Sequence, residues 1–154
     1  MNEACRFPMS IRRGKPFGAA IRFVTLDATR RMLVLEALAA LTTAATAIRF
    51  LPFQRAVALG SRPFRRAKRA SVADIRWSID ATAARLPFRT VCFQKGLAMQ
   101  VMLRRRGHDA QLHYGIRFTD ERVLQGHVWV EADGAMVIGE EDAPGFERVA
   151  TYPG

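Results

Sequence analysis

The spacing of apolar residues along the chain changes at Gly107, from the period of a helix to the period of a strand. Beyond that glycine, residues 110–118 alternate apolar and polar side chains, which is typical of a half-buried strand. A second strand is predicted over residues 123–131 and a third over residues 135–139. Between these two strands, Asp133-Gly134 is a strong signal for a two-residue hairpin turn.

Upstream of Gly107 the pattern predicts four helices, which prolines and glycines separate. They cover approximately residues 27–50, 54–59, 71–86 and 90–106. Three of them begin at a residue whose side-chain oxygen can cap a helix, namely Asp27, Ser71 and Thr90. The last helix is apolar around most of its circumference, so we expect it to be central and buried. Helices followed by an antiparallel meander make the predicted fold class α+β.

The length of 154 residues fits one domain, residues 25–154, preceded by a loosely ordered basic tail, residues 1–24. Positive charge is concentrated in the first half of the chain. Residues 1–70 hold 14 Lys and Arg against 3 acids, a net charge of +11, whereas the remainder holds 10 against 11, a net charge of −1. This asymmetry indicates an acidic partner, peptide or surface for the first half, and simple solubilisation is the alternative.

Two stretches of the first half raise the question of nucleic acid and membrane partners. The basic run at residues 62–69 is either a solvated loop or a polyanion site, and without a helix-turn-helix or RNA-recognition signature no nucleic acid partner is predicted. Residues 32–48 fall short of the roughly 20 apolar residues that a membrane span needs. We predict a buried helix there, with peripheral membrane contact through Arg30, Arg31 and Arg49 as the alternative.

The cysteine content limits the chemistry of the protein. Cys5 and Cys92 are too few for a disulfide framework and lack the spacing of a zinc site, so we predict a reduced, cytoplasmic protein without a metal. The chain has no glycine-rich phosphate loop, and no cofactor is predicted.

Cys92 is the candidate nucleophile. As the second residue of its predicted helix it meets unpaired backbone N–H groups and the positive end of the helix dipole, which lower the pKa of a thiol. The same N–H groups can stabilise an oxyanion. Gln94 is close enough in sequence to be considered as a side-chain oxyanion donor, although a structural role fits an ordinary helix residue better. The alternative for Cys92 is a buried, inert cysteine.

His127 is the candidate base, on a strand that places His127, Trp129 and Glu131 on one face. If Asp133-Gly134 forms a two-residue turn, residues whose numbers sum to 267 lie opposite one another, so Glu140 faces His127 and can orient its imidazole. A turn one residue longer or shorter leaves Glu141 and Asp142 as alternates. Of the other histidines, His113 is expected on the polar face of its strand and His108 in a turn, both at the surface.

These residues occur together in motifs that resemble the transglutaminase-like leader peptidases of lasso-peptide biosynthesis. The resemblance covers roughly residues 30–150 and rests on Leu86-Pro87 followed by Cys92, on residues 102–107 (MLRRRG) and on residues 127–134 (HVWVEADG). It implies a transglutaminase- or papain-like core and a cysteine protease that removes the leader from a ribosomally made precursor before macrocyclisation. Cys92 would attack the scissile carbonyl, and His127 would transfer the proton.

The resemblance also implies partners for the protein. These are the precursor's leader as substrate, a separate leader-recognition protein, and a macrolactam-forming cyclase. One position departs from the family pattern, because the family usually has an Asp on the strand after the His, where this chain reads Ile138-Gly139-Glu140. Two other functions remain open: an acyl-transferase or amidase that uses the same Cys92 and His127, and a non-catalytic basic binding protein.

Overall fold

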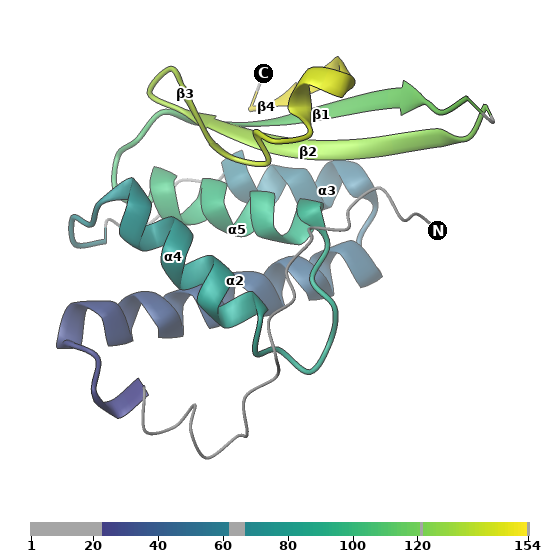
Figure 1. The fold of residues 1–154 in the computed structure, drawn as a ribbon. Coiled ribbons are helices and arrows are strands. Elements are labelled where there is room, and N and C mark those ends of the chain that lie inside the picture. The colour runs from purple at the N-terminus through teal and green to yellow at the C-terminus, as the bar shows by residue number, and fades with distance from the viewer. Residues whose placement is uncertain (1–22, 62–66, 121, 154) are drawn as a thin grey trace.

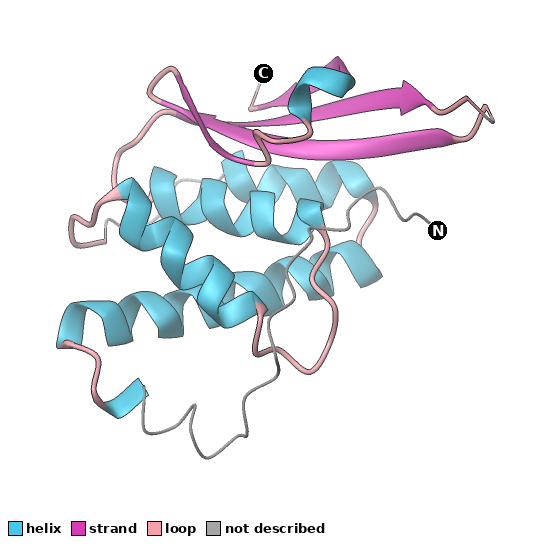
Figure 2. Ribbon diagram, in the orientation of Figure 1, coloured by secondary structure: helices cyan, strands magenta, loops and turns pink. Residues whose placement is uncertain are grey.

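A four-stranded antiparallel sheet lies over a layer of helices in the computed structural model, which describes residues 23–61, 67–120 and 122–153 (Figure 1). Figure 2 shows the segregation of helices to one face of the sheet, apart from one short helix on the other face. The predicted α+β class is confirmed. Nearly all of the predicted basic tail, and residues 62–66 of the basic run, lie outside the described residues.

The helices begin close to their predicted starts. Helix α2 (Ala28–Phe50) is capped by Asp27, whose Oδ1 accepts from the N–H of Arg30 at 2.9 Å. In the same way, Ser71 caps α4 (Val72–Ala83), and its Oγ accepts from the N–H of Asp74 at 3.0 Å. The predicted short helix is divided into α3 (Phe53–Val57) and a 3₁₀ turn, η2 (Ala58–Ser61).

Helix α5 (Cys92–Arg104) begins differently from the prediction, because its N-cap is Val91 and not Thr90. A valine side chain cannot accept a hydrogen bond, and the cap is completed from within the helix. The Oε1 of Gln94 reaches back and accepts from the N–H of Val91 at 3.1 Å, which is one half of a capping box. Cys92 is therefore the first residue of the helix rather than the second.

Helix α2 is 23 residues long and is the one described helix that is long and apolar enough to cross a membrane. Residues 32–48 were expected to be too short for a membrane span, but the helix that contains them is not. Length and composition alone are weak evidence, since core helices of soluble proteins share them. The residues that α2 buries recur every three or four positions: Leu33, Ala37, Leu41, Ala44 and Ala47. This spacing forms a single stripe, and the stripe packs against α4 and α5.

The strands are β1 (Ala110–Phe118), β2 (Leu124–Ala132), β3 (Ala135–Ile138) and β4 (Glu147–Tyr152), in the sheet order β3-β2-β1-β4. The first three match the predicted strands to within about a residue. The fourth was not predicted, and it pairs with β1 after a second 3₁₀ turn, η3 (Ala143–Gly145). Asp133 and Gly134 have φ values of 51° and 83°, as a type I′ hairpin turn requires.

The two faces of the sheet pack against different parts of the chain. On β2, the even-numbered residues Val128, Val130 and Ala132 join the main core with α2, α4 and α5. Helix α5 approaches closely because it has Gly96 at the contact, where an added Cβ would lie 2.8 Å from Cγ1 of Val128. The odd-numbered Trp129 belongs instead to a small second cluster with Ala143 and Phe146 from the η3 region.

Candidate functional site

Cys92 occupies the first position of α5, half-buried and packed against the main core. The backbone N–H groups of Cys92 and Phe93 precede the first hydrogen bonds of the helix, which run from Gln94 and Lys95 back to the carbonyl of Val91. A thiol at this position meets the positive end of the helix dipole. The first turn of α5 thus combines a cysteine thiol with main-chain donors suited to an oxyanion.

His127 lies on β2 with 1% of its surface exposed. Its Nε2 is 2.9 Å from the carbonyl oxygen of Gly139. A carbonyl oxygen can only accept a hydrogen bond, so Nε2 carries a proton and donates it. In the neutral imidazole, Nδ1 is then the atom with the basic lone pair. The structure therefore fixes which nitrogen of His127 can accept a proton from a nucleophile.

Two aromatic rings enclose the imidazole of His127. The ring of Trp129 is stacked at a centroid distance of 6.2 Å and an interplanar angle of 20°, and the ring of Phe146 lies at 5.1 Å and 36°. Trp129 comes from the same strand, whereas Phe146 follows η3, which covers this face of the sheet (Figure 1). The hydrogen bond to Gly139 and these two apolar surfaces thus restrain the imidazole.

Packing brings the first turns of α5 to the segment of β2 that contains His127. Gly96 is one turn after Cys92, and it contacts Val128, the neighbour of His127 in the chain. The side chains of His127 and Val128 point to opposite faces of the sheet, because successive residues alternate along a strand. Strand β3 pairs with Val130 to Ala132 alone and ends at Ile138, so it does not extend along β2 as far as His127.

Glu140 is not brought to His127 by the structure. The predicted sum of 267 holds for Glu131 opposite Met136 and for Ala132 opposite Ala135, but an irregularity between Val130 and Glu131 shifts the next pair to a sum of 268. Strand β3 then ends before it reaches Glu140. The carboxylate of Glu140 accepts instead from Nη1 of Arg76 at 2.9 Å. The main-chain carbonyl of Gly139 occupies the place expected for that carboxylate.

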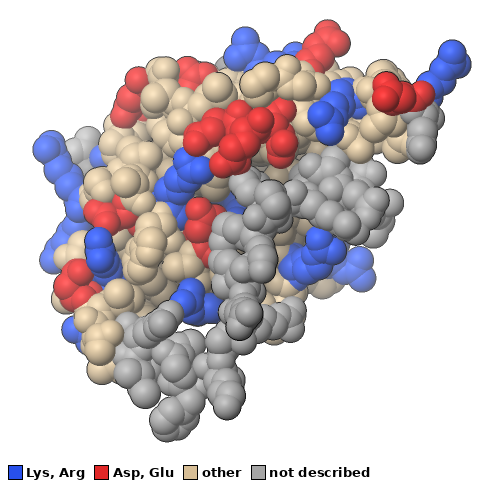
Figure 3. All heavy atoms as spheres, viewed as in Figure 1, with Lys and Arg blue, Asp and Glu red and all other residues tan. Residues whose placement is uncertain are grey.

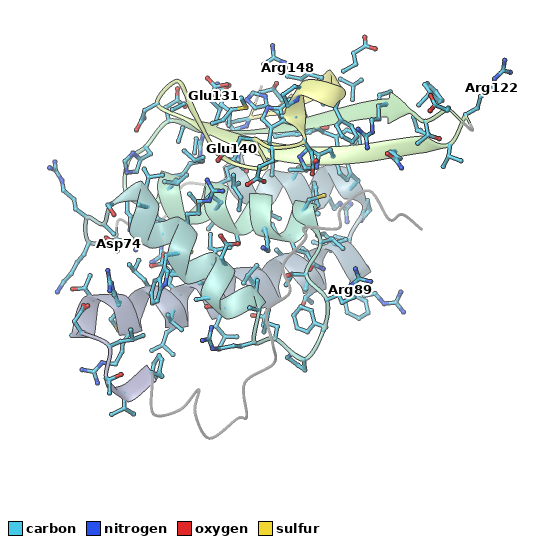
Figure 4. All side chains as sticks on the ribbon, viewed as in Figure 1. Asp74, Arg89, Arg122, Glu131, Glu140 and Arg148 are labelled. Carbon is cyan, nitrogen blue, oxygen red and sulfur yellow. The ribbon has the colours of Figure 1, made fainter. Side chains whose placement is uncertain are left out.

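Glu141 and Asp142, the two alternates to Glu140, are both exposed residues beyond β3. Glu141 is exposed, and its Oε1 lies 3.6 Å from Nη2 of Arg76. Asp142 is exposed at the start of η3. Figure 3 shows acidic side chains gathered on the viewed face with basic ones beside them, and Figure 4 places Glu140 at the boundary between the sheet and the helical layer.

The other two histidines differ from each other. His113, expected at the surface, is 1% exposed, with Nδ1 2.9 Å from Oγ1 of Thr151 and its ring 5.6 Å from that of Trp129. Burial, followed by the positive charge of Arg148, lowers the pKa of His113. His108 lies in the turn after α5, and its Nδ1 is 2.6 Å from Oδ2 of Asp133. That contact lowers the pKa of the Asp133 carboxyl.

Sequence reasoning missed three contributors to the site: the carbonyl of Gly139, the ring of Phe146 and the guanidinium of Arg76. A main-chain acceptor leaves no side-chain signature, although a glycine directly after an apolar strand was a possible signal for a backbone of unusual geometry. Gln94, considered as an oxyanion donor, uses its side-chain oxygen to cap α5. Within the described part of the chain, no three His, Cys, Asp or Glu side chains are grouped to hold a metal ion.

Comparison with known proteins identifies the architecture. The family model described as the transglutaminase-like superfamily matches residues 35–151, which include α5, most of α2 and the sheet up to the last residue of β4. A search of curated proteins and a search of solved structures found no match.

Proposed function

Because this chain belongs to the transglutaminase-like superfamily, whose members include cysteine peptidases and acyltransferases, we propose that it is a cysteine peptidase. The observation that carries the proposal is the position of Cys92 at the start of α5, where main-chain N–H groups can stabilise an oxyanion. The proposal assigns the role of base to His127, whose Nε2–H is held by the Gly139 carbonyl. Its proposed substrate is the precursor of a lasso peptide, from which it removes the leader in the cytoplasm. The sequence motifs around Cys92 and His127 support that choice of substrate.

The proposed reaction begins when Nδ1 of His127 takes the proton of the Cys92 thiol. The thiolate attacks the carbonyl carbon at the end of the leader, and the oxyanion accepts from the N–H groups at the start of α5. The C–N bond breaks as Nδ1 returns its proton to the departing amine of the core peptide. Water, deprotonated by the same nitrogen, then attacks the thioester, which releases the leader as a carboxylic acid and restores the thiol.

The proposed partners act before and after this step. A separate recognition protein would bind the leader and deliver it, and a macrolactam-forming cyclase would use the amine that cleavage exposes. A gene neighbourhood that encodes a short precursor, a recognition protein and an asparagine-synthetase-like cyclase would support this assignment.

Cleavage of the neighbouring precursor, followed by mass spectrometry in the presence of the recognition protein, tests the proposal. Cys92→Ala and His127→Ala should both abolish release of the leader, whereas Cys5→Ala, which removes the other cysteine, should not. Cleavage by Cys92→Ala at the wild-type rate would refute the peptidase and favour a non-catalytic binding protein.

The same experiment in H₂¹⁸O separates hydrolysis from acyl transfer. A peptidase resolves the thioester with water, so the released leader should carry one ¹⁸O in its new carboxyl group. An acyl-transferase passes the acyl group to an amine and leaves no ¹⁸O in the product.

A further inference from the structure

Helix α4 provides a fixed point close to the candidate site. Its residues Ile75 and Ile79 are fully buried in the main core, and α4 packs against both α2 and α5. Arg76 follows Ile75 and extends from this helix toward the chain that leaves β3. A side chain whose helix is anchored in this way can restrain the segment that it contacts.

Arg76 contacts two consecutive carboxylates beyond β3. Its Nη1 donates to Oε1 of Glu140 at 2.9 Å, and its Nη2 lies 3.6 Å from Oε1 of Glu141. The hydrogen bond to Glu140 is the largest of the effects that raise the pKa of Arg76. The side chains of Arg76 and Glu140 are 33% and 36% exposed. A pair this accessible adds little to stability, so its main effect is on position.

The position that the pair controls is that of the Gly139 carbonyl. A peptide bond is planar, so the C=O of Gly139 and the Cα of Glu140 belong to one rigid unit. Gly139 has a φ of 79°, and an added Cβ would lie 2.7 Å from the carbonyl oxygen of Val128. The chain therefore turns sharply at Gly139. Directly after this turn, the side chain of Glu140 ties the chain to Arg76 of α4.

We infer that Arg76 and Glu140 are positioning residues that fix this peptide unit, so that its carbonyl accepts from Nε2 of His127 and keeps Nδ1 as the proton-accepting atom. The inference deepens the proposed function and depends on it for its catalytic meaning. It gives Glu140 an indirect role in place of direct contact with the imidazole. Under this arrangement an exchange of the two charges should keep part of the restraint, and the unchanged Glu141, which also contacts Arg76, limits how much is kept.

Charge reversal tests the inference, in a Cys5→Ser background so that Cys92 is the one remaining cysteine. The proteins compared are the parent, Arg76→Glu, Glu140→Arg and the double reversal. Long-range ¹H–¹⁵N spectra of the histidine rings report which nitrogen of His127 is protonated, with His127→Gln for assignment. Alkylation by iodoacetamide reports the nucleophilicity of Cys92 without any peptide substrate.

Each single reversal should convert the His127 ring from the Nε2–H form to a mixture of tautomers, and should slow alkylation roughly tenfold. The double reversal should recover part of both properties, because Glu141 would still lie beside the new glutamate. Arg76→Lys keeps the positive charge and is a milder change. Its proportion of the Nε2–H tautomer and its alkylation rate should lie between those of the parent and those of Arg76→Glu. The control Arg85→Glu makes the same charge change just beyond α4, where Arg85 bonds to the Ala81 carbonyl, and should leave the His127 spectrum unchanged.

Two results would overturn the inference: a Nε2–H signal that survives Arg76→Glu, or a double reversal no better than either single change. The second result, combined with loss of activity in Glu140→Arg alone, would indicate a direct role for the Glu140 carboxylate. A failure of the proposed function would give a different result. Iodoacetamide would then alkylate Cys92 no faster in the parent than in His127→Gln, whichever nitrogen of the ring is protonated.

Discussion

Gly96 of α5 and Val128 of β2 meet so closely that a Cβ added to the glycine would lie 2.8 Å from Cγ1 of the valine. This contact sets the distance between the helix that begins with Cys92 and the strand that contains His127. The absence of a side chain at Gly96 is therefore a requirement of the site as well as of the core.

Gly96→Ala should lower the free energy of unfolding by about 1–3 kcal/mol, because the added methyl group overpacks the interface. Val128→Ala should relieve part of that loss when the two are combined, so the double-mutant cycle should show favourable coupling. Urea titrations of the four proteins measure this. Gly145→Ala is a suitable control, since its new Cβ would meet the end of the flexible Arg117 side chain. Additive losses at Gly96 and Val128 would contradict the close contact.

Glu36→Gln should destabilise the fold by about 3 kcal/mol, because it leaves nearly buried positive charge without its partner. The carboxylate of Glu36 lies 2.8 Å from Nη1 of Arg105 and 2.7 Å from Nη2 of Arg106, and the Arg106 side chain is 4% exposed. Thermal and urea unfolding give the measurement. The exposed Glu147 offers a matched control, and an equal loss in Glu147→Gln would show that net charge, not pairing, is responsible.

Stability should fall in mildly acidic solution because of His113. Burial lowers its pKa from the ordinary value of 6.5, so the unfolded chain binds a proton more readily than the native protein. The contribution is complete above pH 6.5 and is lost as the pH falls through the lower pKa of the native state. Free energies of unfolding at about pH 7.5 and about pH 5.5 test this. The difference should shrink in His113→Gln, and an unchanged difference would assign it to other groups.

Phe146→Leu should lower kcat with little change in KM, because the ring of Phe146 restrains the imidazole of His127 and has no role in the proposed binding of substrate. The similar volume of leucine should limit the loss of stability to about 1.5 kcal/mol. Steady-state cleavage of the precursor gives both constants. Phe118→Leu is the control, since Phe118 is 69% exposed. A rise in KM at constant kcat would instead place Phe146 in the substrate-binding surface.

The sequence predicted the helices and the hairpin well because their signals are local. Asp27 and Ser71 cap their helices as expected, and Asp133-Gly134 forms its turn. Strand β4 was missed because its pairing partners in β1 lie 31 to 40 positions earlier in the chain, as in Glu147 with Ile116 and Tyr152 with Leu112. Its own residues do not alternate, since the first three are exposed and the last three are half-buried. His113 was placed at the surface because alternation identifies the two faces of a strand but not whether a face is covered.

The sequence predicted the two candidate side chains of the site but not the main-chain group that contacts the imidazole. Cys92 and His127 follow from residue type and spacing, and whether they act together remains a prediction. The partner of Nε2 could not be predicted, because the irregularity after Val130 shifts the register by one residue and the acceptor is a main-chain atom. Long-range pairs such as Arg76 with Glu140 leave no local trace in the sequence.

The alternation of β2 has a consequence for how mutations can damage this protein. Its even positions hold the apolar contacts of the main core, and its odd positions hold His127 and Trp129. A shift of one residue in pairing would exchange the two sets, sending valines to the η3 side and an imidazole into the apolar layer beside α5. An insertion or deletion within this strand should therefore prevent folding altogether, so inactive but well-folded forms should arise from substitutions.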